Sequence, residues 1–258
     1  MSRFLRGAAY GGIVLIVGAA LMLMRLTSID APEARQAAFV AAAPIAPAAP
    51  IAPAAPTAPV AANPVPVARP TDRVDPQWVA TIEAATGIPA RAMIAYASAD
   101  LTVDAEQPGC GLGWNTIAAI GAIESVHATI DGGQLDAAGY PSPAIRGPAL
   151  DGREFAAIAD TDGGVWDGDA RWDRAVGPMQ FIPSTWAHWA ADGNGDGVTD
   201  PNQIDDAALA TARYLCATGN LGTPQNWRAA VFSYNHLDSY VDNVAAIANQ
   251  YATAAGGK

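Results

Sequence analysis

Glu124 is the residue of this chain best suited to acid chemistry. It lies in the run W-N-T-I-A-A-I-G-A-I-E-S-V-H, which contains no lysine or arginine. If Asn115 caps a helix that begins at Thr116, Glu124 shares a helix face with two isoleucines and a glycine. A carboxyl group against an apolar surface, without a cationic partner, has a raised pKa and can act as a general acid near neutral pH. The alternative is a helix that turns its one acid to solvent, and this segment alone leaves both interpretations open.

Two further segments carry side chains suited to a polar ligand. In A-V-G-P-M-Q-F-I-P-S-T-W, a Gly-Pro turn brings Met179 and Gln180 to a surface before a helix starts. A side-chain amide can both donate to and accept from a sugar hydroxyl or N-acetyl group. In S-Y-N-H, Tyr234 and Asn235 end a helix that begins near Trp227. Taken singly, either segment is more often plain packing.

The segment D-G-N-G-D-G-V-T-D matches the first half of a calcium-binding loop. Positions one, three, five and seven of the loop pattern are taken by Asp192, Asn194, Asp196 and the Val198 carbonyl. Position twelve, normally a bidentate glutamate, is Gln203, so Asp205 or Asp206 would have to replace it. The pattern predicts Ca²⁺ or another hard cation in a structural role, and the alternative is a capped acidic turn.

The elements that must hold these residues are predicted to be helices from Thr71 onward. Capping residues, first-turn prolines and terminal glycines predict helices at 76–86, 89–97, 116–130, 183–190, 206–217, 224–234 and 239–252. Residues 131–169 are rich in Gly, Pro and Asp, and the alternations S-P-A-I-R-G-P-A-L and R-E-F-A-A-I-A predict a small β-hairpin flap. We expect a mainly α (α+β) domain.

The charge of the chain restricts its partners. The first 70 residues hold five of the 14 basic and two of the 25 acidic residues, so residues 71–258 carry 9 basic and 23 acidic groups. Phosphate binding relies on cationic side chains, so nucleic acid is excluded as a partner and anionic lipid headgroups are poor ones. A carbohydrate or a peptide remains open.

The first 27 residues are predicted to be a transmembrane signal anchor. Gly7 to Met24 is uncharged and almost wholly apolar, with Arg3 and Arg6 before it and Arg25 after it. Roughly 18 such residues lie at the lower limit for a membrane span, and the charge bias favours export of the remainder. A cleaved signal peptide is the alternative. Residues 28–70 are predicted to be an Ala/Pro-rich extracytoplasmic linker, and residues 71–258 to be the functional domain.

Only two cysteines occur, Cys110 and Cys216, both in the part predicted to be exported. An oxidising compartment lets thiols pair, so a disulfide is favoured over two free buried thiols. Closing a loop of roughly 100 residues is worth about 4 to 5 kcal/mol on the chain-entropy model.

The order and spacing of these motifs, from about Asp75 to Tyr251, resemble those of lytic murein transglycosylases of the membrane-bound B type, in their actinobacterial form. The resemblance implies a lysozyme-like fold and cleavage of the β-1,4 bond between N-acetylmuramic acid and N-acetylglucosamine in peptidoglycan, which leaves a 1,6-anhydro end. It implies Glu124 as the single catalytic acid and base. It implies substrate contacts from Ser125, Met179, Gln180, Tyr234 and Asn235, and a calcium site of Asp192, Asn194, Asp196, Val198 and Asp206. We expect no organic cofactor and a monomeric domain in the cell envelope.

The chain departs from that family in one position and leaves rival functions open. Arg171 stands where family members often have a serine that assists the N-acetyl group, so Asp173 or Trp172 is expected to supply a different contact. Asp173 is also the candidate for electrostatic support of the reaction. The nearest rival is a hydrolase of the same fold that uses water and gives reducing ends. A rival of another class is a non-catalytic wall-binding module.

Overall fold

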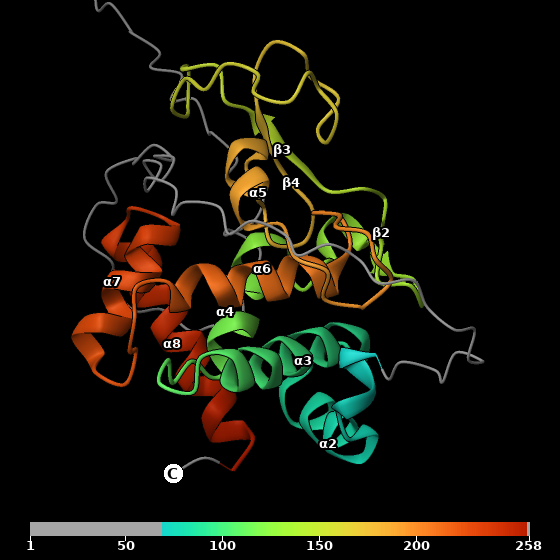
Figure 1. The fold of residues 1–258 in the computed structure, drawn as a ribbon, viewed down its shortest axis with the longest axis vertical. Helices are drawn as coiled ribbons and strands as arrows, with labels where there is room; N and C mark the ends of the chain where they lie inside the picture. The colour runs from blue at the N-terminus through green and yellow to red at the C-terminus, as the bar shows by residue number, and fades with distance from the viewer. Residues whose placement is uncertain (1–68, 257–258) are drawn as a thin grey trace, which may run out of the picture. The chain divides into compact units, whose positions relative to one another are not determined.

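The computed structural model describes residues 69–256, which form seven α-helices joined by loops and short strands (Figure 1). This confirms the predicted fold class, a helical domain with a small β component. The predicted anchor and nearly all of the predicted linker lie outside the described residues. Within residues 69–256, no helix is both long enough and apolar enough to cross a membrane.

Local sequence signals set several helix boundaries. α2 (Pro76–Thr86) begins at a proline that follows Asp75, whose carboxylate accepts a hydrogen bond from the Gln77 amide at 2.8 Å. It ends at Gly87, whose φ of 75° is accessible to glycine without strain. A 3-10 turn, η1 (Pro70–Arg73), precedes it. The remaining helices are α3 (Ala90–Glu106), α4 (Trp114–Ser125), α5 (Pro183–Trp189), α6 (Ile204–Cys216), α7 (Pro224–Tyr234) and α8 (Asp238–Ala254).

α4 differs from its prediction at both ends, and Asn115 is not its N-cap. The amide of Trp114, the first residue of the helix, donates to the Asp100 carboxylate of α3 at 3.0 Å. The Asn115 side chain donates instead to the Ala248 carbonyl of α8 at 3.1 Å. The helix stops well before residue 130 because Val126 adopts a left-handed conformation, with φ 53°. Contacts with neighbouring helices therefore replace the local cap that the sequence predicted.

The hydrophobic core centres on α3 and α6, which lie side by side in Figure 1. Their contact uses small side chains, because alanines fill the buried face of each helix and small residues allow close helix approach. α4 packs against both α3 and α8, and its Ile117 and Ile120 are 0% exposed. The helix that carries Glu124 is thus enclosed along its length, which fixes the position of its last turn.

The β component differs from the predicted hairpin in its strand pairing. β3 (Arg146–Ala149) pairs antiparallel with β4 (Arg174–Val176), which follows the predicted flap. The second predicted strand, within residues 153–159, makes only isolated bridges. A second short pair joins β1 (Gln134–Leu135) to β2 (Pro141–Ser142). The long connection between β3 and β4 is the flap, and its loops are held by aspartate side chains together with isolated backbone bridges.

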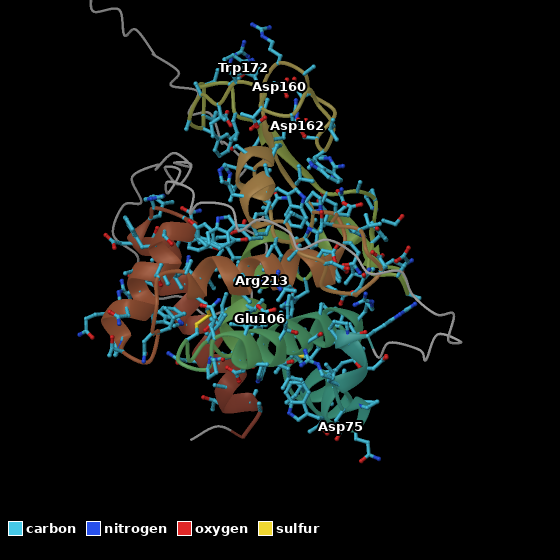
Figure 2. All side chains as sticks on the ribbon, viewed as in Figure 1. Asp75, Glu106, Asp160, Asp162, Trp172 and Arg213 are labelled. Atoms are coloured by element: carbon cyan, nitrogen blue, oxygen red, sulfur yellow. A yellow bond between two sulfur atoms is a disulfide. The ribbon has the colours of Figure 1, made fainter. Side chains whose placement is uncertain are left out.

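Cys110 and Cys216 form a disulfide, as predicted, with their Cα atoms 5.5 Å apart. The bond joins the loop after α3 to the end of α6. Arg213 of α6 and Glu106 of α3 form an ion pair at 2.7 Å in the same part of the domain (Figure 2). The two long helices of the core are therefore joined covalently as well as by packing.

Candidate active site

Glu124 occupies the last turn of α4 and is half-buried. Burial raises the pKa of its carboxyl group from 4.5 to about 7, while a hydrogen bond from the Tyr240 hydroxyl, 2.6 Å from Oε1, acts in the lowering direction. None of the ion pairs found among residues 69–256 involves Glu124. The interpretation of a helix that turns its acid fully to solvent is therefore wrong, and a group of this pKa can donate and accept protons near neutral pH.

Ser125 ties the end of α4 to the Gly-Pro-Met-Gln segment. Its hydroxyl donates to the Pro178 carbonyl at 2.7 Å and accepts from the Ala128 amide at 2.8 Å. The side chain is 0% exposed. Ser125 therefore holds the loop that contains Pro178 in place beside Glu124. Its own side chain is buried and is not accessible to a ligand.

The loop that carries Gln180 has a tightly constrained backbone. A Cβ atom at Gly177, whose φ is 73°, would lie 2.0 Å from the Pro201 carbonyl oxygen, so only glycine fits there. Gln180 itself has a φ of 51°, and its side-chain amide donates to the Gly177 carbonyl at 2.9 Å. The Met179 side chain is 0% exposed and belongs to the core. Of the two residues predicted to reach a surface, the structure leaves only Gln180 accessible.

Tyr234, the last residue of α7, contacts the loop that carries Gln180 and lies near Glu124. Its hydroxyl donates to the Met179 carbonyl at 2.6 Å. Burial, and then the charge of the nearby Glu124, hold the pKa of Tyr234 well above its ordinary value. The next residue, Asn235, has a buried Oδ1 with no hydrogen-bond partner, alone among the buried side-chain atoms of residues 69–256. An orphaned buried acceptor of this kind is what a donor group on a ligand or a water would satisfy.

Tyr240 is the site residue that the sequence reasoning missed. It lies in the first turn of α8, and its hydroxyl is the hydrogen-bond donor to Glu124. Burial and the adjacent carboxylate raise its pKa well above the ordinary value, so the hydroxyl stays protonated and remains a donor. The short link from α7 to α8 was the available signal, because it forces the first turn of α8 to lie near Tyr234.

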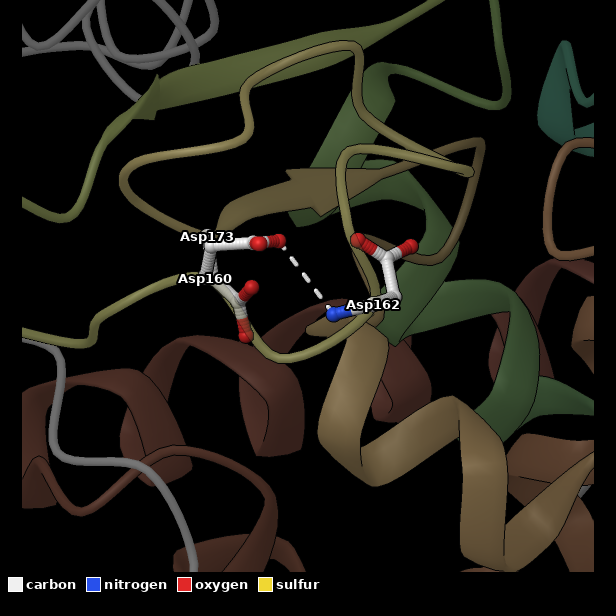
Figure 3. Close-up of side chains that lie close together, drawn as sticks. All are labelled: Asp160, Asp162 and Asp173. Atoms are coloured by element: carbon white, nitrogen blue, oxygen red, sulfur yellow. Dashed lines mark hydrogen bonds between the residues drawn. The ribbon is translucent and has the colours of Figure 1, made fainter.

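Asp173 is placed differently from its prediction. Its carboxylate is 0% exposed and accepts hydrogen bonds from the Thr161 amide at 2.8 Å and the Thr161 hydroxyl at 2.7 Å. It lies in the flap, where its carboxyl group gathers with those of Asp160 and Asp162 (Figure 3). This burial gives no support to a sugar contact or to electrostatic help for Glu124.

The predicted calcium loop is ordered by its own backbone. The Asp192 carboxylate accepts the amides of Gly195, Asp196 and Gly197 at 2.7 to 3.1 Å. Asn194 accepts the Asp196 amide at 2.8 Å. These hydrogen bonds draw the chain into a tight turn, in which Asp192 and Asn194 are half-buried and Asp196 is exposed.

Asp206, rather than Asp205, faces this loop. Its carboxylate accepts the amides of Gly193 at 2.7 Å and Asp200 at 2.9 Å, whereas Asp205 is engaged by Arg91. The oxygen donors suit a hard cation. However, the loop acids do not gather as closely as the three of Figure 3, the one such acidic group found in residues 69–256. Calcium stays a prediction.

A known family model matches the part of the chain that carries most of these site residues. Residues 166–248 match the family model described as Transglycosylase SLT domain. The matched segment contains the Gln180 loop, the acidic loop, Tyr234, Asn235 and Tyr240, and Glu124 lies before it. No curated protein and no solved structure matches the chain. The family match supports a transglycosylase of the lysozyme-like superfamily that acts on peptidoglycan.

Proposed function

We propose that this protein is a lytic transglycosylase that cleaves the β-1,4 bond between N-acetylmuramic acid and N-acetylglucosamine in peptidoglycan and leaves a 1,6-anhydro end. The observation that carries the proposal is the environment of Glu124. Its carboxyl group has a pKa raised to about 7 and, within the part of the chain that the structure describes, a single side-chain hydrogen bond, from Tyr240. A group with that pKa can serve as acid and then as base at one pH.

In the first step, protonated Glu124 gives its proton to the glycosidic oxygen as the bond to the anomeric carbon breaks. The carbonyl oxygen of the substrate's own N-acetyl group attacks the anomeric carbon and forms a bicyclic oxazolinium ion. Tyr240 donates to Oε1, which leaves the other carboxyl oxygen to carry the proton. The tyrosine thereby orients the acid.

In the second step, the Glu124 carboxylate takes the proton from the C6 hydroxyl of the same sugar. The C6 oxygen bonds to the anomeric carbon, and the N-acetyl oxygen leaves and regains its carbonyl double bond. Glu124 ends the cycle protonated, as it began. No water is consumed, so the product is one water lighter than a hydrolysis product.

The placement of the other acids favours one catalytic carboxylate over two. Most glycosidases use a pair of carboxyl groups about 5 to 10 Å apart. The pKa values of Asp100, Asp173 and Asp206 are also raised, mainly by burial. Yet each accepts hydrogen bonds in its own part of the fold: Asp100 from the start of α4, Asp173 in the flap and Asp206 in the acidic loop. This supports the use of the substrate's N-acetyl group.

Gln180 and Asn235 are the side chains that we assign to the sugar subsites. Gln180 retains solvent access beside the end of α4, and the orphaned Asn235 oxygen suits an amide N–H or a hydroxyl of the glycan. Arginine at position 171 stacks on Trp172, 5.8 Å from the ring centroid. Of the two residues expected to replace the family's serine contact, Asp173 is buried, and Trp172 lies under this guanidinium.

Mass spectrometry of the muropeptides released from purified peptidoglycan tests this function. We expect anhydro-muropeptides and few reducing ends. Reducing ends as the main product would identify the hydrolase of the same fold. No release at all, from a folded protein that still sediments with peptidoglycan, would identify the wall-binding module.

We further propose that residues 1–27 hold the protein in the cell membrane and that residues 28–70 carry the domain to the wall. The support is the uncharged run between arginines and the Ala/Pro-rich composition that follows it. Membrane fractionation of cells, with protease added from outside, checks this. Release of the full chain by salt alone would contradict a membrane span.

We also propose that a hard cation such as Ca²⁺ stabilises the acidic loop. The groups that would hold it are Asp192, Asn194, Asp196, the Val198 carbonyl and Asp206. Its contribution would be to fix the loop that packs against Gly177, since the Pro201 carbonyl lies over that residue. No step of the reaction depends on the cation.

A further inference from the structure

Three consecutive residues after Glu124 and Ser125 adopt a left-handed backbone conformation. Val126, His127 and Ala128 have φ values of 53°, 58° and 66°. None is glycine, and a β-branched residue such as valine is a clear outlier in this region. Such residues are strained and persist only where the surroundings over-determine them. The turn therefore has to be held by specific contacts.

The His127 side chain supplies two of those contacts, in addition to the Ser125 hydroxyl, which accepts the Ala128 amide. Its imidazole is 6% exposed and bridges two tyrosines from different helices. Nδ1 lies 3.2 Å from the Tyr96 hydroxyl of α3, and Nε2 lies 2.9 Å from the Tyr251 hydroxyl of α8. Burial lowers the pKa of His127 to about 4, so the ring is neutral at working pH. A neutral imidazole offers one donor and one acceptor, which matches one hydroxyl at each nitrogen.

The side chains around this bridge are tightly packed. A Cβ atom at Gly121 would lie 2.1 Å from the Tyr96 hydroxyl oxygen, so the tyrosine occupies the room that a side chain on α4 would need. The His127 amide donates back to the Gly121 carbonyl at 2.9 Å. Gly121 precedes Glu124 by about one helical turn. The bridge, the turn and the acid are thus joined over a few residues.

α8 contacts the end of α4 at two points. Tyr251 meets His127, and Tyr240 donates to Glu124. The distance between the Tyr240 hydroxyl and the carboxyl group therefore depends on how α8 is held against the turn after α4. His127 is the residue that joins this turn to α8 and to α3 together.

We propose that His127 is a positioning residue, which rests on the proposed function: by bridging Tyr96 and Tyr251 it fixes the strained turn after α4 and so holds the Glu124 carboxyl group against Tyr240. It does not touch the substrate or the reacting atoms. Its contribution lies in the geometry of the proton transfer.

The test compares four variants with the wild-type protein. His127→Phe removes both hydrogen bonds while keeping a ring, and Tyr96→Phe and Tyr251→Phe each remove one hydroxyl. His188→Gln is the matched control, because His188 is an exposed histidine of α5. Circular dichroism and thermal melts first establish that each variant is folded. Turnover of a soluble glycan fragment then gives kcat and KM separately.

We expect His127→Phe to lower kcat by about 10- to 100-fold, since small misplacements of a reacting group cost that much. KM should change by less than about twofold, because His127 makes no ligand contact. The two tyrosine variants should show smaller losses of the same kind, and His188→Gln none. If His127→Phe does not fold, Tyr251→Phe decides. A folded variant with wild-type kcat, or a loss confined to KM, overturns the proposal.

A second readout does not depend on turnover. The Glu124 carboxyl group can be titrated by carbon-13 NMR in the wild type, in His127→Phe and in Tyr240→Phe. Because the Tyr240 hydrogen bond acts to lower the pKa of Glu124, both variants should raise it. An unchanged pKa in His127→Phe overturns the positioning role. Absence of turnover in the wild type would count against the proposed function alone.

Discussion

The partly buried acids at the end of α4 and in the flap differ in their hydrogen-bond donors and, for Glu124 and Asp169, in the direction of their pKa shifts. Among residues 69–256, Glu124 has one side-chain hydrogen bond and no basic partner, and burial raises its pKa to about 7. In the flap, Asp160 accepts amides from Asp162, Gly163 and Gly164. Amides and the guanidinium of Arg174 lower the pKa of Asp169. At Asp169 these donors outweigh burial, whereas at Asp173 and Asp206 burial outweighs the donors and the pKa is raised.

The first environment suits an acid that transfers protons, and the second suits acids that hold loops in place through backbone hydrogen bonds. Amide hydrogen bonds stabilise the charged form of a carboxylate and so act against the effect of burial on its pKa. A carboxyl group with apolar neighbours and one hydroxyl donor keeps its proton. Within residues 69–256 the pKa of Asp206 is also raised to about 7, but its carboxylate accepts backbone amides, whereas the hydrogen bond to Glu124 comes from the Tyr240 hydroxyl.

The largest effect is expected from Glu124→Gln. The variant should fold normally and lose activity by on the order of 10²- to 10⁴-fold, the usual contribution of a general acid or base. Release of muropeptides from purified peptidoglycan measures this. Glu106→Gln, at the ion pair with Arg213, is the control and should keep its activity. A Glu124→Gln variant that still forms anhydro products would refute the assignment.

Calcium should stabilise the acidic loop measurably. At about 100 times its dissociation constant, a cation that binds only the folded state adds about 2.7 kcal/mol. We expect the melting temperature to fall in chelator and to recover with added Ca²⁺. Asp196→Asn, at an exposed loop position, should abolish that response. A melting temperature that is indifferent to both reagents would leave only a capped acidic turn.

Replacing Asp173, whose carboxylate is already hydrogen-bonded to Thr161, should lower the stability of the fold and leave the activity unchanged. Asp173→Asn places an amide against the Thr161 donors, and mispairing of this kind costs about 1 to 3 kcal/mol. Denaturant unfolding measures the cost, and turnover per folded molecule should be unchanged. Glu154→Gln, an exposed flap position, is the matched control. If turnover fell while stability did not, Asp173 would have the supporting role that its burial argues against.

The smallest expected effect is a pH-dependent stability difference between wild type and Glu124→Gln. The folded pKa of Glu124 is raised from 4.5 to about 7. Between these values the unfolded chain loses a proton that the folded protein keeps, so wild-type stability falls as pH rises through this range. Partial solvent access reduces the effect to about 1 to 2 kcal/mol. Unfolding at pH 4.5 and pH 8 should show the variant gaining relative stability at the higher pH.

The sequence predicted the elements with local signals better than those held by distant contacts. α2, α5 and α7 begin at a proline, and the predicted starts agree. α4 begins earlier than predicted because its first amide is bound by Asp100 of α3. No local pattern could indicate that cap. The β3 and β4 pairing likewise joins segments on either side of the flap, whereas the prediction paired neighbours.

The site was predicted in part for the same reason. Glu124 stood out because a lone acid in an apolar run is a local signal, and the structure gives it the raised pKa that was expected. Tyr240 and His127 carry no motif of their own. The short link from α7 to α8 was the available signal for Tyr240, whereas the importance of His127 depends on which helices lie against the turn after α4, and only tertiary structure provides that. Ser125 and Met179 were adjacent in sequence to site residues, yet helical and turn geometry directs both inward.

The disulfide closes a ring of polypeptide that contains some of the site residues and leaves the others on the chain that follows it. Cys110 and Cys216 enclose Glu124 and Gln180 within one ring of polypeptide, and Tyr234 and Tyr240 lie on the tail beyond it. Val165, 71% exposed, projects from the flap inside the ring. A protease that cuts the backbone there would leave both fragments linked through sulfur. The cleaved protein should therefore migrate as one band until reductant is added, with its acid and its tyrosine donor still on connected chains.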